Sequence, residues 1–283
     1  EARSLGVEID TDCEVTRVAV DQRGAHGVEL ADGRAIEARC VIANVNPKLL
    51  YTRLVDPGVL DAQFLDRIRR WKCGSATFRM NVALSELPDF LCLPGSTLQE
   101  HHQSGIVIAP TMRYMEQAYF DARTYGCSRA PVVEMLIPST VDESLAPPGR
   151  HVASLFCQHF NPELPNQLDW DEIREPAADL VIDTVTRYAP NFKDAILGRS
   201  ILTPLDMERE FALTGGDIFH GALTLDQLWS ARPMLGHADY RGPVKGLYMC
   251  GAGTHPGGGV TGLPGRNAAG EILRDLGKRS RRK

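Results

Sequence analysis

The stretch that decides the fold is GLYMCGAGTHPGGGVTGLPGRNAAGEIL, residues 246–273. Its first part, residues 247–250, is a short apolar run of the kind found in a buried strand. Six glycines follow within a dozen residues. Beyond them, apolar side chains recur at helical spacing on one face: Leu263, Ala268, Ala269, Ile272, Leu273 and Leu276. The sequence therefore predicts a strand, a glycine-rich loop and a helix, in that order.

A loop of this kind has the features of a ligand site. A strand, a glycine loop and a helix together aim several backbone N–H groups and the positive end of the helix at one place. Glycines let the backbone turn sharply and come close to a flat or anionic ligand. The alternative is an ordinary glycine-rich connector, which the presence of Thr254, His255 and Pro256 among the glycines disfavours.

A second junction between a strand and a helix lies near the start of the chain. Residues 40–43 form a continuous apolar run, which is typical of a strand buried on both faces. A helix is expected over residues 47–54, with Asn46 as its N-cap and Pro47 in its first turn. Asn44 thus lies at the carboxyl end of a strand just before a helix, where ligands bind in α/β sheets.

Composition limits the class of protein. The chain has 283 residues and a formal net charge of −5, which argues against nucleic-acid binding. No apolar run approaches the ~20 residues that span a bilayer, so no transmembrane segment is expected. The seven cysteines are scattered, odd in number and without a CxxC pair, which favours reduced thiols over a disulfide framework. No metal site is predicted.

The pattern of elements predicts an α/β chain with a mixed α+β insertion. The strand-rich beginning, residues 1–46, and the end, residues 236–283, are expected to form one layer, with residues 47–235 as the second domain. Within that domain, residues 75–84 alternate, giving a half-buried strand whose polar face could line a cavity. Four apolar side chains fit either a cavity wall or core packing: Phe78, Met80, Phe156 and Phe160.

The glycine loop and its helix resemble the C-terminal flavin-binding signature of the phytoene desaturase and amine oxidase group of FAD-dependent oxidoreductases. Within that group the chain most resembles the pyridine nucleotide-disulfide oxidoreductase domain-containing proteins, through residues 27–47, 85–90, 215–233 and 255–273. The resemblance implies a Rossmann-like FAD-binding domain with an inserted mixed-sheet substrate domain. It does not extend to the strand–GxGxxG–helix segment that holds the FAD pyrophosphate, because residues 251–256 read GxGxxP. We therefore expect the C-terminal portion of a flavoenzyme, inactive alone.

The resemblance implies FAD as the cofactor and assigns roles to the loop. The N–H groups of Val260, Thr261 and Gly262 would face the flavin, where reduction places negative charge. The rest of the expected cofactor-binding set is Val15, Asn44, Gly251, Ala252, Gly253, Thr254 and Gly259. Val15, in the first long strand, would contact adenine through its backbone, or would simply pack in the core.

Two histidines are candidates for catalysis. His255 is either a hydrogen-bond partner or base near the flavin, or fixes the loop through its own backbone. His220, in GGDIFHG, either presents an imidazole to a substrate pocket or is structural. Arg232 either orients an anionic group or lies on the surface. The adjacent His101 and His102 lack ligand partners at metal-binding spacing and are expected to be exposed.

The sequence thus predicts an FAD-dependent oxidoreductase that removes hydride from a small, apolar substrate. The alternatives are a non-catalytic regulatory or interaction protein on a flavoprotein scaffold and, more weakly, a nicotinamide-dependent dehydrogenase. A homo-oligomer is compatible with the sequence. The expected location is the cytoplasm for a bacterial protein and the mitochondrial matrix for a eukaryotic one.

Overall fold

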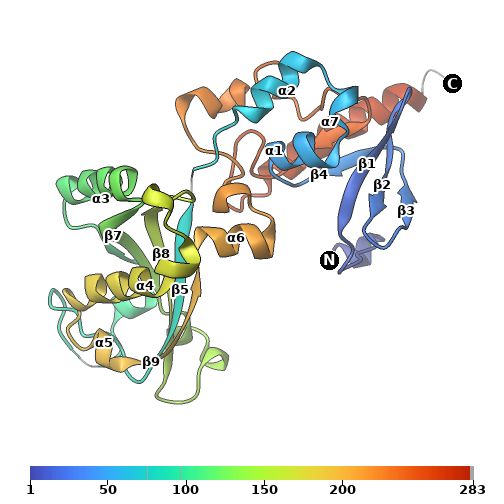
Figure 1. The fold of residues 1–283 in the computed structure, drawn as a ribbon. Helices are drawn as coiled ribbons and strands as arrows, with labels where there is room; N and C mark the ends of the chain where they lie inside the picture. The colour runs from blue at the N-terminus through green and yellow to red at the C-terminus, as the bar shows by residue number, and fades with distance from the viewer. Residues whose placement is uncertain (75, 96, 281–283) are drawn as a thin grey trace. The chain divides into compact units, whose positions relative to one another are not determined.

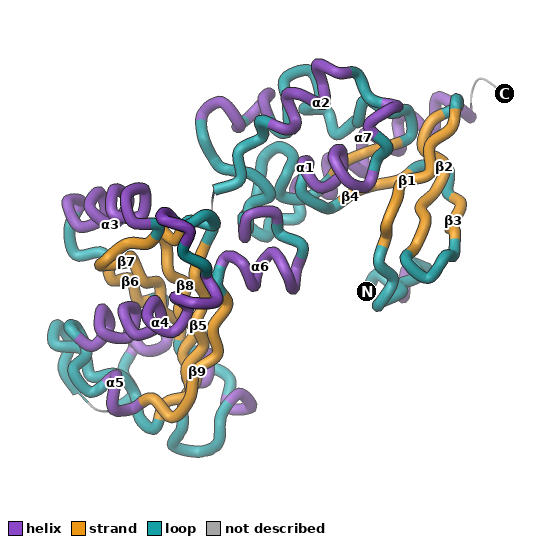
Figure 2. The backbone as a smooth tube through the Cα atoms, in the orientation of Figure 1, coloured by secondary structure: helices purple, strands orange, loops and turns teal. Residues whose placement is uncertain are grey.

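The computed structural model describes residues 1–74, 76–95 and 97–280. The chain forms two compact units (Figures 1 and 2). Unit 1 combines Glu1–Lys72 with the chain from Phe219 onward, and unit 2 is Cys73–Ile218.

These boundaries differ from the predicted insertion over 47–235. Residues 47–72 and 219–235 pack with the two ends of the chain instead of with the middle. The physical reason lies in the helix α2 (Ala62–Arg69), whose inward face contributes Phe64 and Ile68 to the same apolar cluster as Leu247. A helix packs against the core that buries its apolar face. For α2 that core belongs to unit 1. The assignment of cofactor to one domain and substrate to the other stays a prediction.

Unit 1 contains two small sheets. Three strands form an antiparallel meander, namely β1 (Val15–Asp21), β2 (Gly24–Leu30) and β3 (Ala35–Glu37). The other sheet pairs β4 (Val41–Ala43) in parallel with β10 (Leu247–Met249). The helices of this unit are α1 (Pro47–Leu49), α2 and α7 (Leu263–Ser280). The expected strand–loop–helix order over 246–273 is confirmed.

Local capping explains where α1 begins. The Asn46 side chain accepts a hydrogen bond from the Lys48 N–H at 2.8 Å, and Pro47 occupies the first turn. The expected helix over 47–54 is shorter in its α form, because a π-helical turn, Leu50–Leu54, follows. That turn buries Leu50 and Tyr51 completely or nearly so, so the whole segment is anchored in the core of unit 1.

Unit 2 is a five-stranded sheet with helices. Its strands are β5 (Thr77–Leu84), β6 (Ile106–Ile108), β7 (Cys127–Leu136), β8 (His151–Phe160) and β9 (Ile196–Leu202), in the order β6-β7-β8-β5-β9. All four pairings are antiparallel, so the expected mixed sheet is corrected in this detail. The helices are α3 (Met112–Tyr125), α4 (Trp170–Thr186), α5 (Phe192–Ala195) and α6 (Pro204–Phe211). The expected combination of helices and sheets is confirmed.

One face of this sheet is buried and the other is open. Phe78, Met80 and Phe160 are at most 1% exposed and pack in a cluster with Val181 and Val185 of α4. For these three, core packing is therefore correct and the cavity wall is wrong. Alternate residues of the same strands point the other way and are only partly covered, such as Phe156 and Arg79. Helices α3 and α4 lie beside the sheet of unit 2 (Figure 1).

The prediction that His101 and His102 are exposed is wrong, because His101 is partly buried and His102 is fully buried. The His102 side chain is 0% exposed. Its Nδ1 accepts a hydrogen bond from the Gln99 N–H at 3.1 Å, so Nε2 carries the proton and donates to the Pro88 carbonyl at 2.9 Å. His102 is buried because both ring nitrogens find partners in its own loop region, which no local sequence pattern reveals.

Among the described residues, no helix combines the length and the apolar character needed to cross a membrane.

Candidate functional site

The glycine loop begins where two parallel strands end side by side. β10 pairs with β4 through Leu247↔Val41 and Met249↔Ala43, and the Cys250 N–H continues the ladder to the Ala43 carbonyl at 2.9 Å. Asn44 directly follows β4, and Gly251 follows β10 after Cys250. Parallel strands present their carboxyl ends at one edge, so these two predicted site residues meet there.

The backbone conformation and the close neighbours of residue 251 both require glycine in the unmodified protein. Its φ is +83°, and a Cβ at this position would lie 1.7 Å from Asn44 Oδ1. A second close approach occurs further along, where a Cβ on Gly258 would lie 2.4 Å from Cδ1 of Phe219. The glycines therefore bring the loop against Asn44 on one side and the 219–221 segment on the other.

A buried arginine holds these segments together. Arg232 is 0% exposed, and its guanidinium lies 5.4 Å from the ring centroid of Trp71. Nε and Nη2 both donate to the Ala252 carbonyl, at 2.9 and 2.7 Å. Nη1 and Nη2 also donate to three further carbonyls, those of Phe219, Gly221 and Gln227. The surface alternative for Arg232 is therefore wrong.

This arrangement satisfies a charge that would otherwise be costly to bury. Carbonyl dipoles from separate loops replace the water around the guanidinium. In return, the planar donor fork of arginine fixes the positions of those loops relative to one another. Arg232, for which the sequence left two roles open, therefore connects the glycine loop to its neighbouring segments. Its position before Pro233 was the only feature that distinguished it from other arginines in the sequence.

The two candidate histidines lie on this scaffold. His220 has a φ of +56°, and its carbonyl accepts a hydrogen bond from Trp71 Nε1 at 3.0 Å. Its Cβ is 3.6 Å from the position that a Cβ on Gly253 would occupy. His220 therefore lies against the glycine loop, as a substrate-side or cofactor-side residue would.

His255 is fixed through its backbone. Its carbonyl accepts a hydrogen bond from the Tyr240 hydroxyl at 2.9 Å, and that hydroxyl accepts one from Asn267 Nδ2 of α7 at 2.8 Å. Thr254 is 0% exposed, and its hydroxyl donates to the Gly251 carbonyl at 3.0 Å. These bonds are what the structural alternative for His255 requires, and a role for its ring stays a prediction.

The end of the loop is exposed. Gly259, Val260, Thr261 and Gly262 are all solvent-exposed, with Val260 at a φ of +56°. The Thr261 hydroxyl accepts a hydrogen bond from the Leu263 N–H at 3.2 Å and so caps α7. Across the described chain, the N–H groups of 260–262 donate to no other residue. Because they precede an 18-residue helix, they offer donors and a positive dipole end to an anionic group.

These features fit the N1–C2=O edge of a flavin, which gains negative charge on reduction. Of the predicted residues, the structure thus brings together Asn44, Gly251–His255 and His220, and puts Gly259–Gly262 at the start of α7. Val15 is elsewhere: it begins β1 and pairs with Leu30 in the meander. It is therefore not at the centre of its strand, and its contact with adenine stays a prediction.

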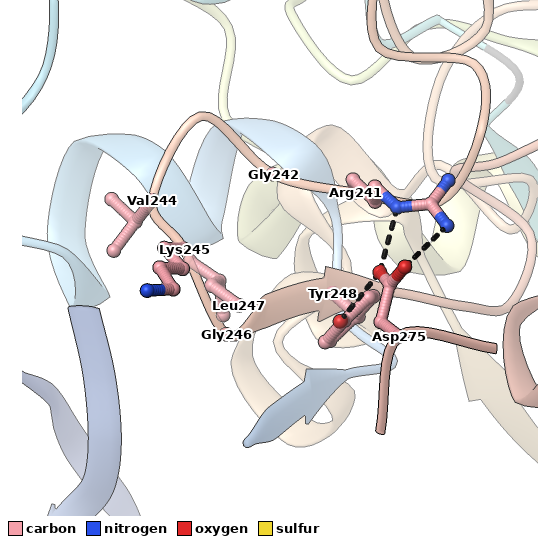
Figure 3. Close-up of a pocket in the computed structure, with 8 residues that line it drawn as sticks. All are labelled: Arg241, Gly242, Val244, Lys245, Gly246, Leu247, Tyr248 and Asp275. Carbon is pink, nitrogen blue, oxygen red and sulfur yellow. Dashed lines mark hydrogen bonds and ion pairs between the residues drawn. The ribbon is translucent and has the colours of Figure 1, made fainter. Parts of the chain in front are cut away.

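A polar network that the sequence did not reveal locks α7 onto β10. Arg241 donates from Nε to Asp275 Oδ2 at 2.8 Å (Figure 3). Its Nη2 also donates to Glu271 Oε2 at 2.7 Å. The Tyr248 hydroxyl donates to the same Asp275 oxygen at 2.9 Å. These carboxylates raise the pKa of Arg241, and Arg241 lowers that of Glu271. The spacing of four between Glu271 and Asp275 on one helix face was the only available signal.

This network borders a cavity of about 260 Å³, whose lining is drawn in Figure 3. The lining includes Gly246 and Leu247. These residues precede or begin β10, whereas the glycine loop follows its other end. The cavity is therefore separate from the loop, and its neighbouring charges serve to hold the helix that the loop enters.

Comparison with known proteins agrees with the resemblance seen in the sequence. The chain is 43% identical over 281 residues to pyridine nucleotide-disulfide oxidoreductase domain-containing protein 2 of Mus musculus, covering 97% of this chain and 48% of the relative. It is 27% identical over 263 residues to the lycopene-forming phytoene desaturase of Pseudescherichia vulneris, covering 92% and 49%. The chain spans about half the length of the curated relatives it matches. No protein-family model matches it.

Solved structures share the fold. An oxidoreductase from Methanosarcina mazei gives a TM-score of 0.60 at 16% identity, covering 96% of this chain and 51% of that one. A triple mutant of putrescine oxidase, redesigned in cofactor binding, gives 0.54 at 17% identity with the same coverage. The resemblance to the phytoene desaturase and amine oxidase group is thereby confirmed. The relatives are oxidoreductases.

Proposed function

We propose that this chain forms part of an FAD-dependent oxidoreductase, with the loop 251–262 and the start of α7 facing the flavin. The proposal rests on one observation: the first half of this loop is anchored by hydrogen bonds, whereas its second half is exposed to solvent. Arg232 and Tyr240 hold the first half through Ala252 and His255. The second half leaves the N–H groups of residues 260–262 available ahead of a long helix. The names of the relatives, which include a phytoene desaturase and an oxidoreductase domain protein, support the same reaction class.

In this proposal each part of the chain has a limited task. FAD, when bound, supplies the hydride acceptor. The N–H groups of Val260, Thr261 and Gly262 stabilise the negative charge that develops at the flavin edge. The backbone of residues 251–254 follows the ribityl and phosphate part, with Asn44 beside it.

The histidines have the remaining roles. His220 would orient or deprotonate the substrate, and His255 would bond the cofactor. A hydride transfer of this kind needs no strong acid or base when the substrate C–H or N–H bond is well positioned. The substrate is proposed to be small and apolar.

The test is the flavin content of the protein purified from its complete reading frame. We expect a yellow protein that releases about one FAD per chain on denaturation, identified by chromatography. Gly262→Asp puts a carboxylate at the exposed start of α7, where no atom lies within 4 Å of the added Cβ and where the φ of +69° is one that aspartate adopts more readily than most side chains. It should remove most of the bound flavin. Gly277→Asp adds the same charge to the other end of α7, again with free space, and should retain it.

A colourless protein that takes up no added FAD contradicts the proposal and favours a regulatory protein on the same scaffold. Full flavin content in Gly262→Asp would show that the helix start does not face the cofactor.

A further inference from the structure

The open face of the unit 2 sheet carries a pocket that the proposed flavin site does not use. Its volume is about 310 Å³. It follows one row of cross-strand neighbours, in which Val107 pairs with Glu134, Glu134 with Phe156, and Phe156 with Arg79. The remaining lining is Gly105, Ile106, Met135, Leu136 and Ser154. The pocket thus lies entirely within one rigid sheet, on the face opposite the core.

Arg79 is held in place without being neutralised. Its guanidinium carbon lies 5.3 Å from the ring centroid of Phe156, and Nη2 donates to Ser154 Oγ at 3.1 Å. Within residues 1–74, 76–95 and 97–280, no carboxylate oxygen lies within 4.0 Å of this guanidinium. Ser154 uses one of five N–H donors. A positioned arginine with donors to spare is suited to a carboxylate, which it can bind through two parallel hydrogen bonds.

The carboxylate in the same pocket has a neutral partner. Gln158 Nε2 donates to Glu134 Oε1, and this amide holds the Glu134 side chain in place. Phe156 separates Glu134 from Arg79, because their strands β7 and β5 lie on either side of β8. A bound anion is therefore attracted to the Arg79 end and repelled from the Glu134 end, which sets its orientation.

The rest of the pocket is apolar. Val107 and Leu136 are 60% and 56% exposed. Together with the Phe156 ring, they offer a surface that gains stability when an apolar chain covers it. The volume is at the lower end of the roughly 300–1,000 Å³ typical of small-molecule sites, which limits the ligand to a short one.

We propose that this pocket binds a small amphipathic carboxylate, with its carboxylate on Arg79 and its apolar chain on Phe156, Val107 and Leu136. Binding requires no flavin and no chemistry at the glycine loop, so it stands whether or not the proposed function does.

The test compares three probes that share one chain and differ in the head group: octanoate, octanol and octylamine. Titration calorimetry on the whole protein, with and without added FAD, measures each affinity. We expect octanoate to bind most tightly under both conditions. Equal affinities for octanoate and octanol would overturn the role of Arg79, and tighter binding of octylamine would overturn the carboxylate in favour of an amine at Glu134.

Variants identify the residue responsible. Arg79→Gln should weaken octanoate by at least about tenfold, the effect of losing one charge-assisted contact, and leave octanol unchanged. Arg129→Gln is the matched control, because Arg129 also lies over an aromatic ring, that of Tyr125 at 4.7 Å, but is paired with Asp121. It should leave octanoate binding unchanged.

Arg79→Lys controls for misfolding of the Arg79→Gln variant, because lysine keeps the positive charge and loses only the planar set of N–H donors. It should bind octanoate more weakly than the unmodified protein while octanol binding is retained. Unchanged octanoate affinity in both Arg79 variants would refute the proposal.

Discussion

Replacing Arg232 with methionine removes a buried cation that four carbonyl oxygens surround. Methionine keeps an apolar stem of similar length against Trp71, so the change isolates the guanidinium. Each hydrogen bond to a charged group contributes about 1.5–3 kcal/mol, but these contributions do not add. The variant no longer has to desolvate a charge, and some of the freed carbonyls can turn to water. We therefore expect a loss of about 3–5 kcal/mol, because each buried carbonyl left without a donor costs about 1–3 kcal/mol and only some of the four regain water.

That loss is large against a typical folding free energy of about 5–15 kcal/mol. Urea unfolding followed by circular dichroism measures it, and hydrogen exchange locates it. The Thr254 and Ala222 amides, which bond the Gly251 and Lys72 carbonyls, should lose protection first, because Arg232 holds both segments. Arg232→Lys should recover less than half of the loss, since an ammonium cannot span the same carbonyls.

The control is Arg23→Met, whose side chain is 89% exposed in its ion pair with Asp21. It should change stability by no more than about 0.5 kcal/mol. A loss below about 1 kcal/mol for Arg232→Met, with unchanged exchange at Thr254 and Ala222, would refute the view that Arg232 organises the loop.

Three further predictions concern other parts of the chain. Burial lowers the pKa of His101 and of His151 below 6.5, so the folded state binds fewer protons than the unfolded one. Stability should be fully present above pH 6.5 and fall as the pH drops below it, and His101→Gln with His151→Gln should reduce that slope in pH-dependent urea unfolding. Asp275→Asn should lower the free energy of unfolding by about 1–2 kcal/mol, because the Arg241–Asp275 network is only partly screened by solvent. An unchanged urea midpoint would contradict this. Gly251→Ala should lower the thermal midpoint, and adding Asn44→Ala should restore only part of it, since the φ of +83° remains; complete rescue would show that the clash alone matters.

Features encoded by neighbouring residues could be predicted from the sequence. The Asn46 cap, the two short apolar strands and the helix after the glycines all depend on contacts within a few residues or on a repeating pattern. The parallel pairing of the two strands, which brings Asn44 to Gly251, is a tertiary contact that the sequence did not predict.

Features that depend on tertiary partners could not be predicted. Arg232 is buried because the carbonyls of Ala252 and Phe219, distant in the chain, converge on it. His102 is buried because Gln99 and Pro88 satisfy its ring. Polar residues are expected to be exposed unless they are paired. Pairing with partners distant in the chain produces no periodic pattern in the sequence. The same reason explains the shifted unit boundary, since the inward face of α2 has no marker of which core it joins.

The anchors of the loop suggest that its shape is set before a ligand arrives. Arg232 fixes Ala252, and Tyr240 fixes His255 to Asn267 of α7, so the turn is determined at both sides by residues outside it. A site whose donors are already oriented loses little entropy on binding and can stabilise developing charge without reorganising. The exposed segment 260–262 is short and is followed directly by the capped start of α7. The hydrogen bond from the Leu263 N–H to the Thr261 hydroxyl ties this segment to the first turn of α7, and Arg241 holds the same helix further along, at Asp275.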